Sequence, residues 1–379
     1  MRCRLLMLNY EFPPIGGGGG NAHLCLLRQY AGRGDLKIDV LTSAPKPGQS
    51  QESLSENIKI YKVGLHKKEL HFWRRMEVIE WLAKASVHYR RLLRENQYDL
   101  VHAFFGFPTG WLCYQSRDRL PYIISLRGSD VPGYNIRLGL DYKLLAGLFR
   151  RIWSAAAAVV ANSNGLRRLA LEFMPGLNVR VIPNGIDAEK FHPLEKQGIT
   201  KPIRLLTVCR LIRRKRIDLL IEAVGHARTL GLDVRLNIAG EGNLMEPLKR
   251  LANELGVADS VSFMGRVPVE QMPQIYRDSH IFVMSSAHEG MSNAMLEAMA
   301  SGLPIITTYC EGVDELIADN GIVMEASQAD GIADAIGFLA NDKETYVRMA
   351  HAARERAALF SWSTVAEQYI RCYQEILRR

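Results

Sequence analysis

The sequence predicts an α/β protein made of about two domains. Its 379 residues exceed the usual size of a single domain, for which about 100–150 residues is typical. In both halves of the chain, short apolar segments typical of buried strands alternate with helical patterns, and turn residues follow several of the strands. The composition, 47% hydrophobic and 23% charged, is that of a soluble globular protein.

In the first half, apolar segments bounded by polar residues predict strands separated by helices. The strands are expected at residues 4–9, 37–41, 58–63, 99–105, 122–126 and 156–161, and the helices at 22–30, 66–95 and from 162 onward. Residues 44–55 are rich in Pro, Gly and Ser and predict a polar loop. Residues 188–201 have the character of a linker between the two domains.

The second half repeats this alternation. Strands are expected at residues 203–209, 234–239, 261–265, 281–284 and 303–307, and helices at 293–300 and from 360 onward. Residues 280–308 form the most informative stretch, because they predict a strand, a loop, a short helix and a further strand in sequence. Gly302 and Pro304 are expected to end that helix.

Cysteine usage and the N-terminal residues indicate a cytoplasmic protein. The apolar part of the N-terminal segment is too short for a signal peptide. No apolar run approaches the roughly 20 residues that span a bilayer. The cysteines are scattered, without C-x-x-C spacing or histidine partners at metal-binding spacing, which is typical of small core residues in a reducing compartment. They are Cys3, Cys25, Cys113, Cys209, Cys310 and Cys372.

Charge is distributed unevenly along the chain. Residues 1–190 contain 27 Lys and Arg against 16 Asp and Glu, a net charge of +11, whereas residues 191–379 have a net charge of −3. This asymmetry suggests an anionic partner for the first half: a membrane surface, a nucleic acid or an acidic substrate. No zinc-finger spacing, RNP-like motif or heptad repeat supports nucleic acid, so we expect no nucleic-acid partner.

A run of five glycines, 16–20, separates the first predicted strand from the first predicted helix. Backbone amides can close on a phosphate or sugar there, because glycine has no Cβ. A flexible loop is the alternative interpretation. A dinucleotide-binding fingerprint would require an acidic residue at the end of the second strand. That strand ends in Thr42-Ser43, with Asp39 in its middle, which argues against NAD.

Two carboxylates and two cations are the main candidates for chemistry in the second half. Glu289 lies in the loop before the helix at 293–300, and Glu297 lies on its second turn among apolar neighbours. A buried carboxylate needs hydrogen-bond partners, and the alternative for Glu297 is a half-exposed residue of an amphipathic helix. Arg210 and Lys215, five residues apart at a strand-to-helix junction, can bind two phosphates, or belong to a solvated basic loop.

The segment from Glu289 to Glu297 resembles the E-x7-E signature of family 4 of the retaining nucleotide-sugar glycosyltransferases. The other motifs of that family follow in the same order along most of the chain. The resemblance implies the GT-B fold, in which two Rossmann-like domains face each other and a C-terminal helix crosses back to the first domain. It places the first domain at residues 1–190, completed by about 363–379, and the second at 191–362.

The resemblance also implies a role for each donor-binding residue. Glu289 would contact sugar hydroxyls of the donor, and Glu297 would hold the nucleotide ribose. Arg210 and Lys215 would bind the diphosphate, although Arg216 stands where the family often has glycine. Backbone groups would complete the site: the amides of Gly290, Met291, Ser292 and Asn293 at the diphosphate, the loop of Gly16, Gly17 and Gly18 near the phosphates, and Gly265, Arg266 and Val267 at the base.

We place the acceptor side in the first domain. His102 is expected at the C-terminal end of a buried strand, where α/β proteins bind ligands, although a structural histidine is the alternative. Arg127 stands where many family members have a histidine. Because arginine stays charged, it does not suit a general-base role, and binding an anion or orienting the acceptor fits better. Asp130 follows in the same loop.

The resemblance implies transfer from a nucleotide-diphosphate sugar, with UDP favoured by family frequency, and with retention of configuration. No two aspartates are separated by a single residue, so the metal-binding D-x-D motif of another transferase class is missing. No metal or other cofactor is expected, because cations and helix amides would stabilise the leaving diphosphate. The alternatives are a glycoside hydrolase using Glu289 and Glu297, a sugar-nucleotide epimerase, and a non-catalytic sugar-nucleotide binding protein.

The predicted helix at 66–95 bears on where the enzyme works. It contains eight Lys and Arg against four acids, interleaved with Phe72, Trp73, Trp81 and Tyr89. Basic helices with aromatic residues bind membrane interfaces. Alternatively, this is an ordinary helix of the domain whose aromatic residues face its own sheet, and Met76, Ile79, Ala83 and Val87 form a stripe of the kind such a helix has. Together with the charge of the first half, the helix favours a peripheral enzyme that modifies a glycan or lipid-linked acceptor at an anionic membrane surface.

Overall fold

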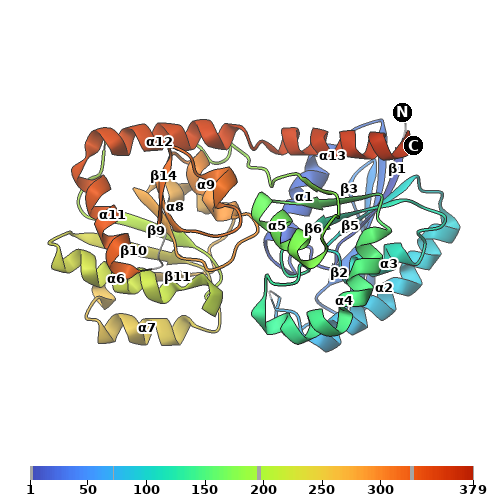
Figure 1. The fold of residues 1–379 in the computed structure, drawn as a ribbon, viewed down its shortest axis with the longest axis horizontal. Coiled ribbons are helices and arrows are strands. Elements are labelled where there is room, and N and C mark those ends of the chain that lie inside the picture. Colours follow the sequence, from blue (N-terminus) through green and yellow to red (C-terminus); the bar gives the residue numbers. More distant parts are fainter. Residues whose placement is uncertain (1–2, 71, 194–197, 325–327, 379) are drawn as a thin grey trace. The chain divides into compact units, whose positions relative to one another are not determined.

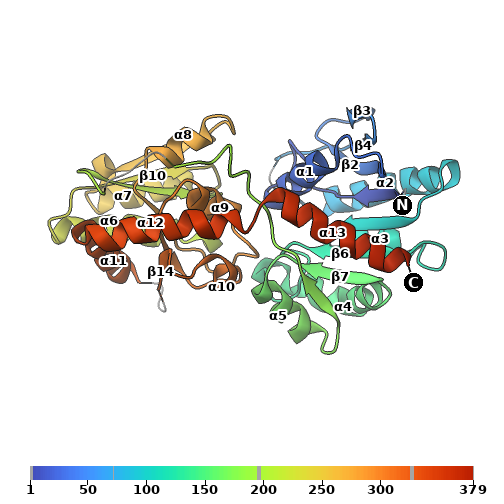
Figure 2. The ribbon, with the colours of Figure 1, turned by 90° about the horizontal axis from the view of Figure 1, so that it is seen from above.

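The computed structural model describes residues 3–70, 72–193, 198–324 and 328–378 (Figures 1 and 2). The chain divides into two compact units. The first unit comprises Met1–Gly185 and Trp362–Arg379, and the second comprises Ile186–Ser361. The boundaries expected from the sequence, 190/191 and 362/363, differ from these by a few residues.

The first unit is built on an eight-stranded sheet with the order β3-β4-β2-β1-β5-β6-β7-β8. Its elements are β1 (Cys3–Leu8), α1 (Gly18–Tyr30), β2 (Leu36–Ala44), β3 (Gln49–Ser55), β4 (Ile58–Gly64), α2 (Arg75–Glu95), β5 (Leu100–Phe104), α3 (Thr109–Tyr114), β6 (Tyr122–Leu126), the 3-10 helix η1 (Ile136–Leu138), α4 (Gly139–Ser154), β7 (Ala158–Ala161), α5 (Asn164–Phe173), β8 (Val179–Val181) and α13 (Trp362–Leu377). The strands pair in parallel, except that the edge strand β3 is antiparallel to β4.

The prediction of a polar loop over residues 44–55 was wrong, because Gln49–Ser55 forms strand β3. This strand lies at the edge of the sheet, and its first five residues are exposed. An edge strand with polar residues lacks the apolar alternation that reveals half-buried strands. Pairing with β4, rather than burial of apolar side chains, therefore explains why this segment is extended.

The C-terminal helix α13 packs into the core of the first unit. Its residues Val365, Ala366, Tyr369 and Tyr373 are buried in the same apolar cluster as the central strands. The helix is amphipathic, and α1 is one of the elements that it contacts. The C-terminal residues thus complete the first unit although the second unit precedes them in the chain.

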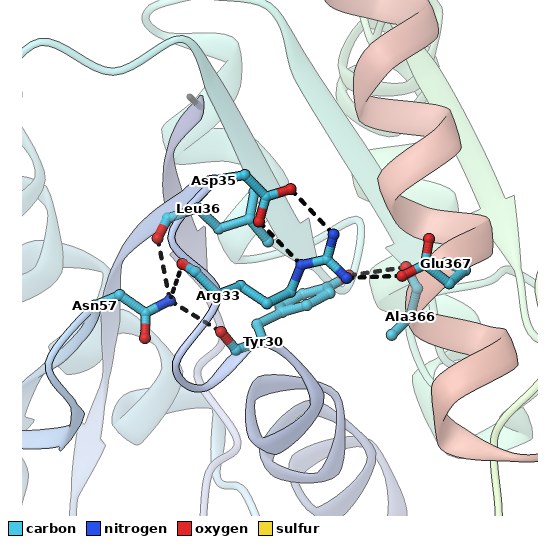
Figure 3. Close-up of polar contacts among 7 residues, drawn as sticks. All are labelled: Tyr30, Arg33, Asp35, Leu36, Asn57, Ala366 and Glu367. Carbon is cyan, nitrogen blue, oxygen red and sulfur yellow. Dashed lines mark hydrogen bonds and ion pairs between the residues drawn. The ribbon is translucent and has the colours of Figure 1, made fainter. Parts of the chain in front are cut away.

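The connection between α1 and β2 is held by a polar network that also reaches α13 (Figure 3). Arg33 donates hydrogen bonds to Asp35, at 3.1 and 3.0 Å, and to Glu367 of α13, at 2.7 Å. The Nδ2 group of Asn57 donates to the carbonyl groups of Tyr30 (2.9 Å), Arg33 (3.2 Å) and Leu36 (3.0 Å). One side-chain amide therefore satisfies backbone carbonyls on both sides of the turn.

We expect Asn57→Ala to lower the free energy of unfolding by about 2–3 kcal/mol, because it leaves several partly buried backbone groups without their hydrogen bonds. Urea unfolding followed by circular dichroism measures this. Ser55→Ala is the matched control, since it removes only the bond from Ser55 Oγ to Asn57 Oδ1 (2.8 Å) and should cost less than about 1 kcal/mol. Equal losses for the two variants would contradict this role of the amide.

Helix α2 is shorter than predicted, and it buries aromatic residues that the membrane interpretation required to be accessible. It begins at Arg75 rather than His66, because the buried carboxylate of Glu77 accepts hydrogen bonds from the backbone amides of Arg74 (3.0 Å) and Lys68 (3.1 Å). Trp81 and Tyr89 face the core and are 0% and 2% exposed. The prediction that these aromatics are available to a membrane was therefore wrong.

The alternative interpretation, an ordinary helix whose aromatic residues face its own sheet, is confirmed for Trp81 and Tyr89. The aliphatic stripe that this interpretation included was placed wrongly, because Met76, Ile79 and Val87 are 72%, 57% and 61% exposed. The helix therefore buries its aromatic stripe and presents its aliphatic stripe to solvent. In the part of the chain that the structure describes, no helix has both the length and the apolar character needed to cross a membrane.

The second unit has a six-stranded, wholly parallel sheet with the order β11-β10-β9-β12-β13-β14. Its elements are β9 (Ile203–Val208), η2 (Arg213–Lys215), α6 (Ile217–Thr229), β10 (Val234–Ala239), α7 (Met245–Glu254), η3 (Ala258–Ser260), β11 (Val261–Gly265), α8 (Met272–Arg277), β12 (Ile281–Met284), α9 (Asn293–Ala300), β13 (Ile305–Thr308), α10 (Val313–Leu316), β14 (Gly321–Met324), α11 (Ala329–Asn341) and α12 (Lys343–Ala358). Two apolar clusters form its core.

The start of the predicted linker belongs to the second unit. Phe191 is buried in one of its apolar clusters. Arg354 of α12 donates hydrogen bonds to the carbonyl groups of Phe191 (2.9 Å) and Ala188 (3.0 Å). The middle of the predicted linker, residues 194–197, lies outside the described residues.

Candidate active site

The carboxyl edge of the second sheet gathers the predicted donor-binding residues that belong to the second unit. In a parallel sheet, the loops that follow neighbouring strands emerge at the same edge, where α/β proteins bind ligands. The loop after β9 contains Arg210 and Lys215, and the loop after β11 contains Arg266 and Val267. The loop after β12 contains the segment 289–292, and α9 follows it.

The loop that carries Arg210 is supported by the turn after β10. Leu211 donates its amide hydrogen bond to the carbonyl of Glu241 (2.9 Å), and the amide of Gly240 donates to the carbonyl of Gly265 (2.8 Å). A Cβ at Gly240 or Gly242 would overlap backbone atoms of residues 209–211, so both positions require glycine. The Arg210 side chain is exposed on this packed loop.

The turn that carries Lys215 is tied directly to the end of β12. Ser285 donates from its Oγ to the carbonyl groups of Lys215 (3.0 Å) and Arg216 (2.7 Å). The amide of Ala287 donates to the carbonyl of Arg214 (2.8 Å). Lys215 is thereby held against the loop of the E-x7-E segment.

Arg216, at the end of this turn, has φ +48° and ψ +42°, the left-handed conformation. That conformation costs a residue with a Cβ about 1–2 kcal/mol, which explains why glycine suits the position. We expect Arg216→Gly to leave the stability unchanged or to raise the free energy of unfolding by up to about 1 kcal/mol, since glycine's extra freedom in the unfolded chain offsets part of the gain.

Thermal unfolding checks this expectation. Arg213→Gly is the matched control, because Arg213 is exposed in the same turn and does not have positive φ. The control should lower stability by about 0.5–1 kcal/mol. A loss of stability in Arg216→Gly as large as in the control would show that no strain is stored at Arg216.

Lys215 and Glu289 form an ion pair between the Lys215 Nζ and the Glu289 Oε1. Both side chains are 11% exposed. Burial lowers the pKa of Lys215 to about 8, and the guanidinium groups of Arg214 and Arg210 act in the same direction. Ser286 donates from its Oγ to the same oxygen of Glu289 (3.2 Å).

The conformation of the Glu289 loop depends on Glu311, which follows β13. One oxygen of Glu311 accepts the amide hydrogen of Glu289 (2.9 Å), and the other lies 2.8 Å from Nδ1 of His288. A Cβ at Gly312 would lie 2.7 Å from the carbonyl oxygen of Gly290, so the two loops meet backbone to backbone. Sequence reasoning did not select Glu311 or His288, although neighbouring parallel strands β12 and β13 predict that their loops meet.

Helix α9 begins directly after this loop. Ser292 is its N-cap, and its side chain accepts a hydrogen bond from the amide of Met295 (3.2 Å). The first turn of a helix carries partial positive charge and favours anions. The predicted diphosphate-binding segment Gly290–Asn293 therefore lies at a helix N-terminus, beside Glu289.

Glu297 is half-buried on the second turn of α9. The Tyr276 hydroxyl donates a hydrogen bond to its Oε2 (2.8 Å) and lies 3.2 Å from the carbonyl oxygen of Ala294. Burial raises the pKa of Glu297 to about 7, although the bond from Tyr276 favours the ionised form. Because this pKa exceeds the unfolded value of about 4.5, the carboxyl contributes most to stability below pH 4.5 and progressively less as the pH rises through 7.

This pKa predicts pH-dependent nucleotide binding. If ribose hydroxyls donate to the ionised Glu297, affinity for a nucleoside diphosphate should rise by up to about tenfold from pH 6 to pH 8. Calorimetry at both pH values measures the change. In Glu297→Gln the pH dependence of affinity that is due to Glu297 should vanish. Only the pH dependence that is due to ionisation of the nucleotide's phosphate should remain. The same pH dependence in wild type and variant would contradict the role of Glu297.

The base-side segment begins at Gly265, which ends β11 with φ +65°. Arg266 is exposed, and Val267 is partly buried against an apolar cluster of the second unit. The bond from Gly240 to the Gly265 carbonyl joins this segment to the loop beneath Arg210.

In the first unit, the glycine loop is packed rather than flexible. Gly16 has φ +92°, and its amide donates to the carbonyl of Leu70 (2.8 Å). The amide of Gly17 donates to Glu11 Oε2 (3.4 Å), and α1 starts at Gly18. A Cβ at Gly16 would lie 2.6 Å from Cβ of Glu11. The glycine at position 16 is therefore required by the close approach of Glu11, and binding of a phosphate or sugar by this loop stays a prediction.

His102 lies in the core of the first unit and is 0% exposed. Its Nδ1 lies 2.8 Å from the Tyr373 hydroxyl, and its Nε2 lies 2.7 Å from Oγ of Ser125. Burial lowers the pKa of His102 well below its usual value, with His23 and Arg127 contributing. With both ring nitrogens engaged, the structural role fits His102 better than contact with an acceptor.

Arg127 belongs to the same network. It donates to Asn184 Oδ1 (2.8 Å) and to the Tyr369 hydroxyl (3.1 Å), which lies 2.9 Å from Ser125 Oγ. Its guanidinium carbon lies 4.5 Å from the centre of the Phe104 ring, a cation–π distance. Sequence reasoning missed Tyr369 and Tyr373 because α13 is more than 200 residues away from these strands.

Asp130 organises the loop after β6. It is 3% exposed, and its carboxylate accepts the amide hydrogens of Gly106 (2.7 Å), Arg127 (2.9 Å) and Gly128 (2.9 Å). Burial raises the pKa of Asp130, while these backbone bonds oppose the shift. The carboxylate fixes the backbone that presents Arg127.

Comparison with known proteins gives matches over nearly the whole chain. The model described as glycosyltransferase family 4 matches residues 17–190, and that of the glycosyl transferases group 1 matches residues 191–356. A GDP-mannose-dependent alpha-(1-6)-phosphatidylinositol monomannoside mannosyltransferase of Mycobacterium tuberculosis is 30% identical over 304 residues, which cover 74% of this chain and 77% of the relative. The chain belongs to the family 4 glycosyltransferases.

Other matches to this family 4 glycosyltransferase span its full length. A phosphatidylinositol N-acetylglucosaminyltransferase subunit of Arabidopsis thaliana is 26% identical, over all of this chain and 83% of the relative. Sucrose-phosphate synthase from Thermosynechococcus elongatus superposes with a TM-score of 0.82 at 20% identity, over all of both chains. HepE from Anabaena, solved with UDP and glucose, superposes with a TM-score of 0.76 at 17% identity over 98% and 100% of the two chains.

These findings confirm the family and the GT-B fold that the resemblance implied. The glycosyltransferase assignment rests on the family, and each unit has the parallel α/β sheet that the fold requires. Among the described residues of this glycosyltransferase, no group of three His, Cys, Asp or Glu side chains is arranged to hold a metal ion.

Proposed function

We propose that this glycosyltransferase moves a sugar from a nucleotide-diphosphate sugar to an acceptor hydroxyl, with retention of configuration. The contact between Lys215 and Glu289 carries the proposal. In such a donor, the anomeric carbon of the sugar and the β-phosphorus share one oxygen. A residue that binds the phosphate and a residue that binds the sugar must therefore be neighbours, as these two are.

The cations and the helix would act on the leaving group. As the bond from the anomeric carbon to the phosphate oxygen breaks, negative charge grows on the diphosphate. Arg210, Lys215 and the amides at the start of α9 neutralise that charge without a metal ion. The acceptor oxygen bonds to the anomeric carbon from the same face, and its proton passes to an oxygen of the leaving phosphate, so configuration is retained.

Two nucleotides have support as the carrier of the donor sugar, UDP and GDP. Family frequency favours UDP, whereas the mannosyltransferase relative is named as GDP-mannose-dependent. The experiment is a thermal-shift panel of UDP-, GDP- and ADP-linked sugars in EDTA. We expect one nucleotide series to raise the melting temperature in the absence of metal. No shift with any nucleotide sugar, or a shift that appears only with Mg²⁺ or Mn²⁺, would contradict the proposed donor site.

Turnover then separates the proposal from its alternatives. With the donor found in the panel, proton NMR should show transfer to an acceptor with the anomeric configuration of the donor. Conversion of the donor to its epimer without an acceptor would identify an epimerase. Donor binding without turnover on any membrane or glycan fraction would identify a binding protein. Release of sugar from simple glycosides without nucleotide would identify a hydrolase.

The proposed acceptor is a lipid-linked or cell-envelope glycan at the inner face of a membrane. Two observations support it. Residues 1–190 carry a net charge of +11, which suits an anionic surface. Two of the relatives are named for reactions on phosphatidylinositol or its mannoside. The proposal accordingly places the enzyme in the cytoplasm, peripheral to the membrane.

A further inference from the structure

The exposed face of helix α2 combines apolar and basic side chains. Met76, Ile79, Ala83 and Val87 are exposed and repeat every three or four residues, so they form one stripe along the helix. Large apolar side chains are usually buried, and three of these four are more than half exposed. The stripe lies opposite the buried face of Trp81 and Tyr89 and is not covered by the core of its own unit.

Helix α4 extends this surface. Leu140 and Leu144 are 64% and 75% exposed, one turn apart near its start. The two helices are joined by the ion pair between Arg75 and Asp141 (3.0 Å). Arg137, just before α4, stacks over the ring of Phe72, just before α2, at 4.4 Å. Phe72 is itself 40% exposed.

Both helices cover the same side of the sheet. They connect parallel strands in the same direction across the sheet, β4 to β5 and β6 to β7, and such crossovers are right-handed. Figure 1 shows α2, α3 and α4 together on the side of the first unit opposite α13. Their solvent faces therefore point the same way, away from the strands.

The charges on this surface are mainly positive. Arg90 and Arg94 are exposed on the same side of α2 as the apolar stripe, Arg75 is exposed at the start of the helix in its ion pair with Asp141, and Lys143 is exposed on α4. Carboxylates at the start of α2 are neutralised within the protein. Glu77 is buried and paired with Lys67 (2.7 Å), and Glu80 is paired with Lys84 (2.7 Å). The surface thus presents aliphatic side chains among exposed cations.

We propose that this α2–α4 face, formed by Phe72, Met76, Ile79, Ala83, Val87, Leu140 and Leu144 with the flanking arginines, inserts shallowly into an anionic lipid bilayer. The inference rests on the proposed lipid-linked acceptor, which would be reached from that bilayer. An aliphatic stripe with arginines along it suits the boundary between acyl chains and headgroups, because the long arginine stems extend to the phosphates. The positive charge selects anionic lipid.

Vesicle co-sedimentation tests the proposal with the full chain. Vesicles of phosphatidylcholine alone are compared with vesicles that also contain phosphatidylglycerol. The variant carries Met76→Gln, Ile79→Gln and Val87→Gln. Its matched control carries Leu230→Gln, Leu255→Gln and Leu359→Gln, which replace exposed apolar residues of the second unit. All six positions are exposed, so the fold should be preserved.

Wild type and control should bind the anionic vesicles, with binding that weakens as salt rises. The stripe variant should bind at least about tenfold more weakly. A tryptophan placed on the stripe, Ile79→Trp, should show blue-shifted fluorescence with anionic vesicles only. Equal binding by the stripe variant and the control, or no binding by wild type, would overturn the proposal.

Two further readouts distinguish lipid docking from self-association and from a failure of the proposed function. Sedimentation velocity should give the same mass for wild type and the stripe variant. A mass that falls in the variant would identify a second copy of the chain as the partner and overturn the lipid proposal. Nucleotide binding in solution should be unchanged in the variant. No vesicle binding by wild type, with intact donor binding, would reject the docking face and leave the proposed transferase activity standing.

Discussion

Replacement of Lys215 by alanine is expected to lower the rate of sugar transfer about 10²–10³-fold while the protein stays folded. The ammonium group is held by a turn whose carbonyls are bonded to Ser285, so it is positioned before the donor binds. A positioned cation stabilises charge on the leaving diphosphate without reorganisation. Arg210→Ala should cause a loss of the same order. Steady-state kinetics with the preferred donor measures both.

Lys215→Ala alone leaves the carboxylate of Glu289 without its partner, which can lower stability for reasons unrelated to catalysis. The double variant Lys215→Met, Glu289→Gln removes both buried charges and should fold while remaining inactive. Arg213→Ala, an exposed arginine in the same turn, is the control and should keep full activity. Activity within about twofold of wild type for both Lys215→Ala and Arg210→Ala would refute the assignment.

Replacement of the two glutamates of the E-x7-E segment should affect different steps: one should weaken nucleotide binding, and the other should slow turnover. Glu297→Gln keeps the shape of the side chain and its contact with Tyr276 but weakens acceptance of hydrogen bonds from ribose. Nucleotide affinity should fall by about 1.5–3 kcal/mol, the contribution of a charged hydrogen bond. Glu289→Gln should lower turnover more than the affinity for a free nucleoside diphosphate, because its proposed partner is the sugar.

Calorimetry with nucleoside diphosphate, together with kinetics on the full donor, separates the two effects. The two carboxylates have different surroundings, since Glu289 pairs with Lys215 in the loop before α9 and Glu297 lies on the second turn of α9, beside Tyr276. Equal losses of nucleoside diphosphate affinity in the two variants would show that this division of roles is wrong.

Much of the fold followed from local sequence patterns. Apolar strands followed by glycine-rich turns predicted the α/β alternation, and the family resemblance predicted the GT-B arrangement that the comparisons confirm. Strand β3 was missed because a polar edge strand is defined by pairing with β4, which no local pattern records.

Helix α2 illustrates a different limit. Its sequence contains two stripes of helical period, one through Trp81, Ala85 and Leu92 and one through Met76, Ile79 and Val87. Periodicity alone cannot choose between them. The structure buries the aromatic stripe, which removes more apolar area from water.

The candidate site was predictable where motif residues are close in sequence. Glu289, in the loop, and Glu297, on helix α9, lie within one strand–loop–helix segment. Contacts made across the sheet were not predictable. Glu311 supports Glu289 from the next strand, and Tyr369 and Tyr373 reach His102 and Arg127 from the last helix. Such contacts are set by topology, because only the folded sheet brings those segments together.

The central claim is that the second unit binds a diphosphate through Arg210, Lys215 and the start of α9, with no metal ion. Calorimetric titration in EDTA with a nucleoside diphosphate and with the matching monophosphate tests it most directly. We predict that the diphosphate binds at least about tenfold more tightly than the monophosphate and that Lys215→Ala abolishes the difference. Equal binding of the two nucleotides by wild type, or diphosphate binding only after Mg²⁺ or Mn²⁺ is added, would contradict it.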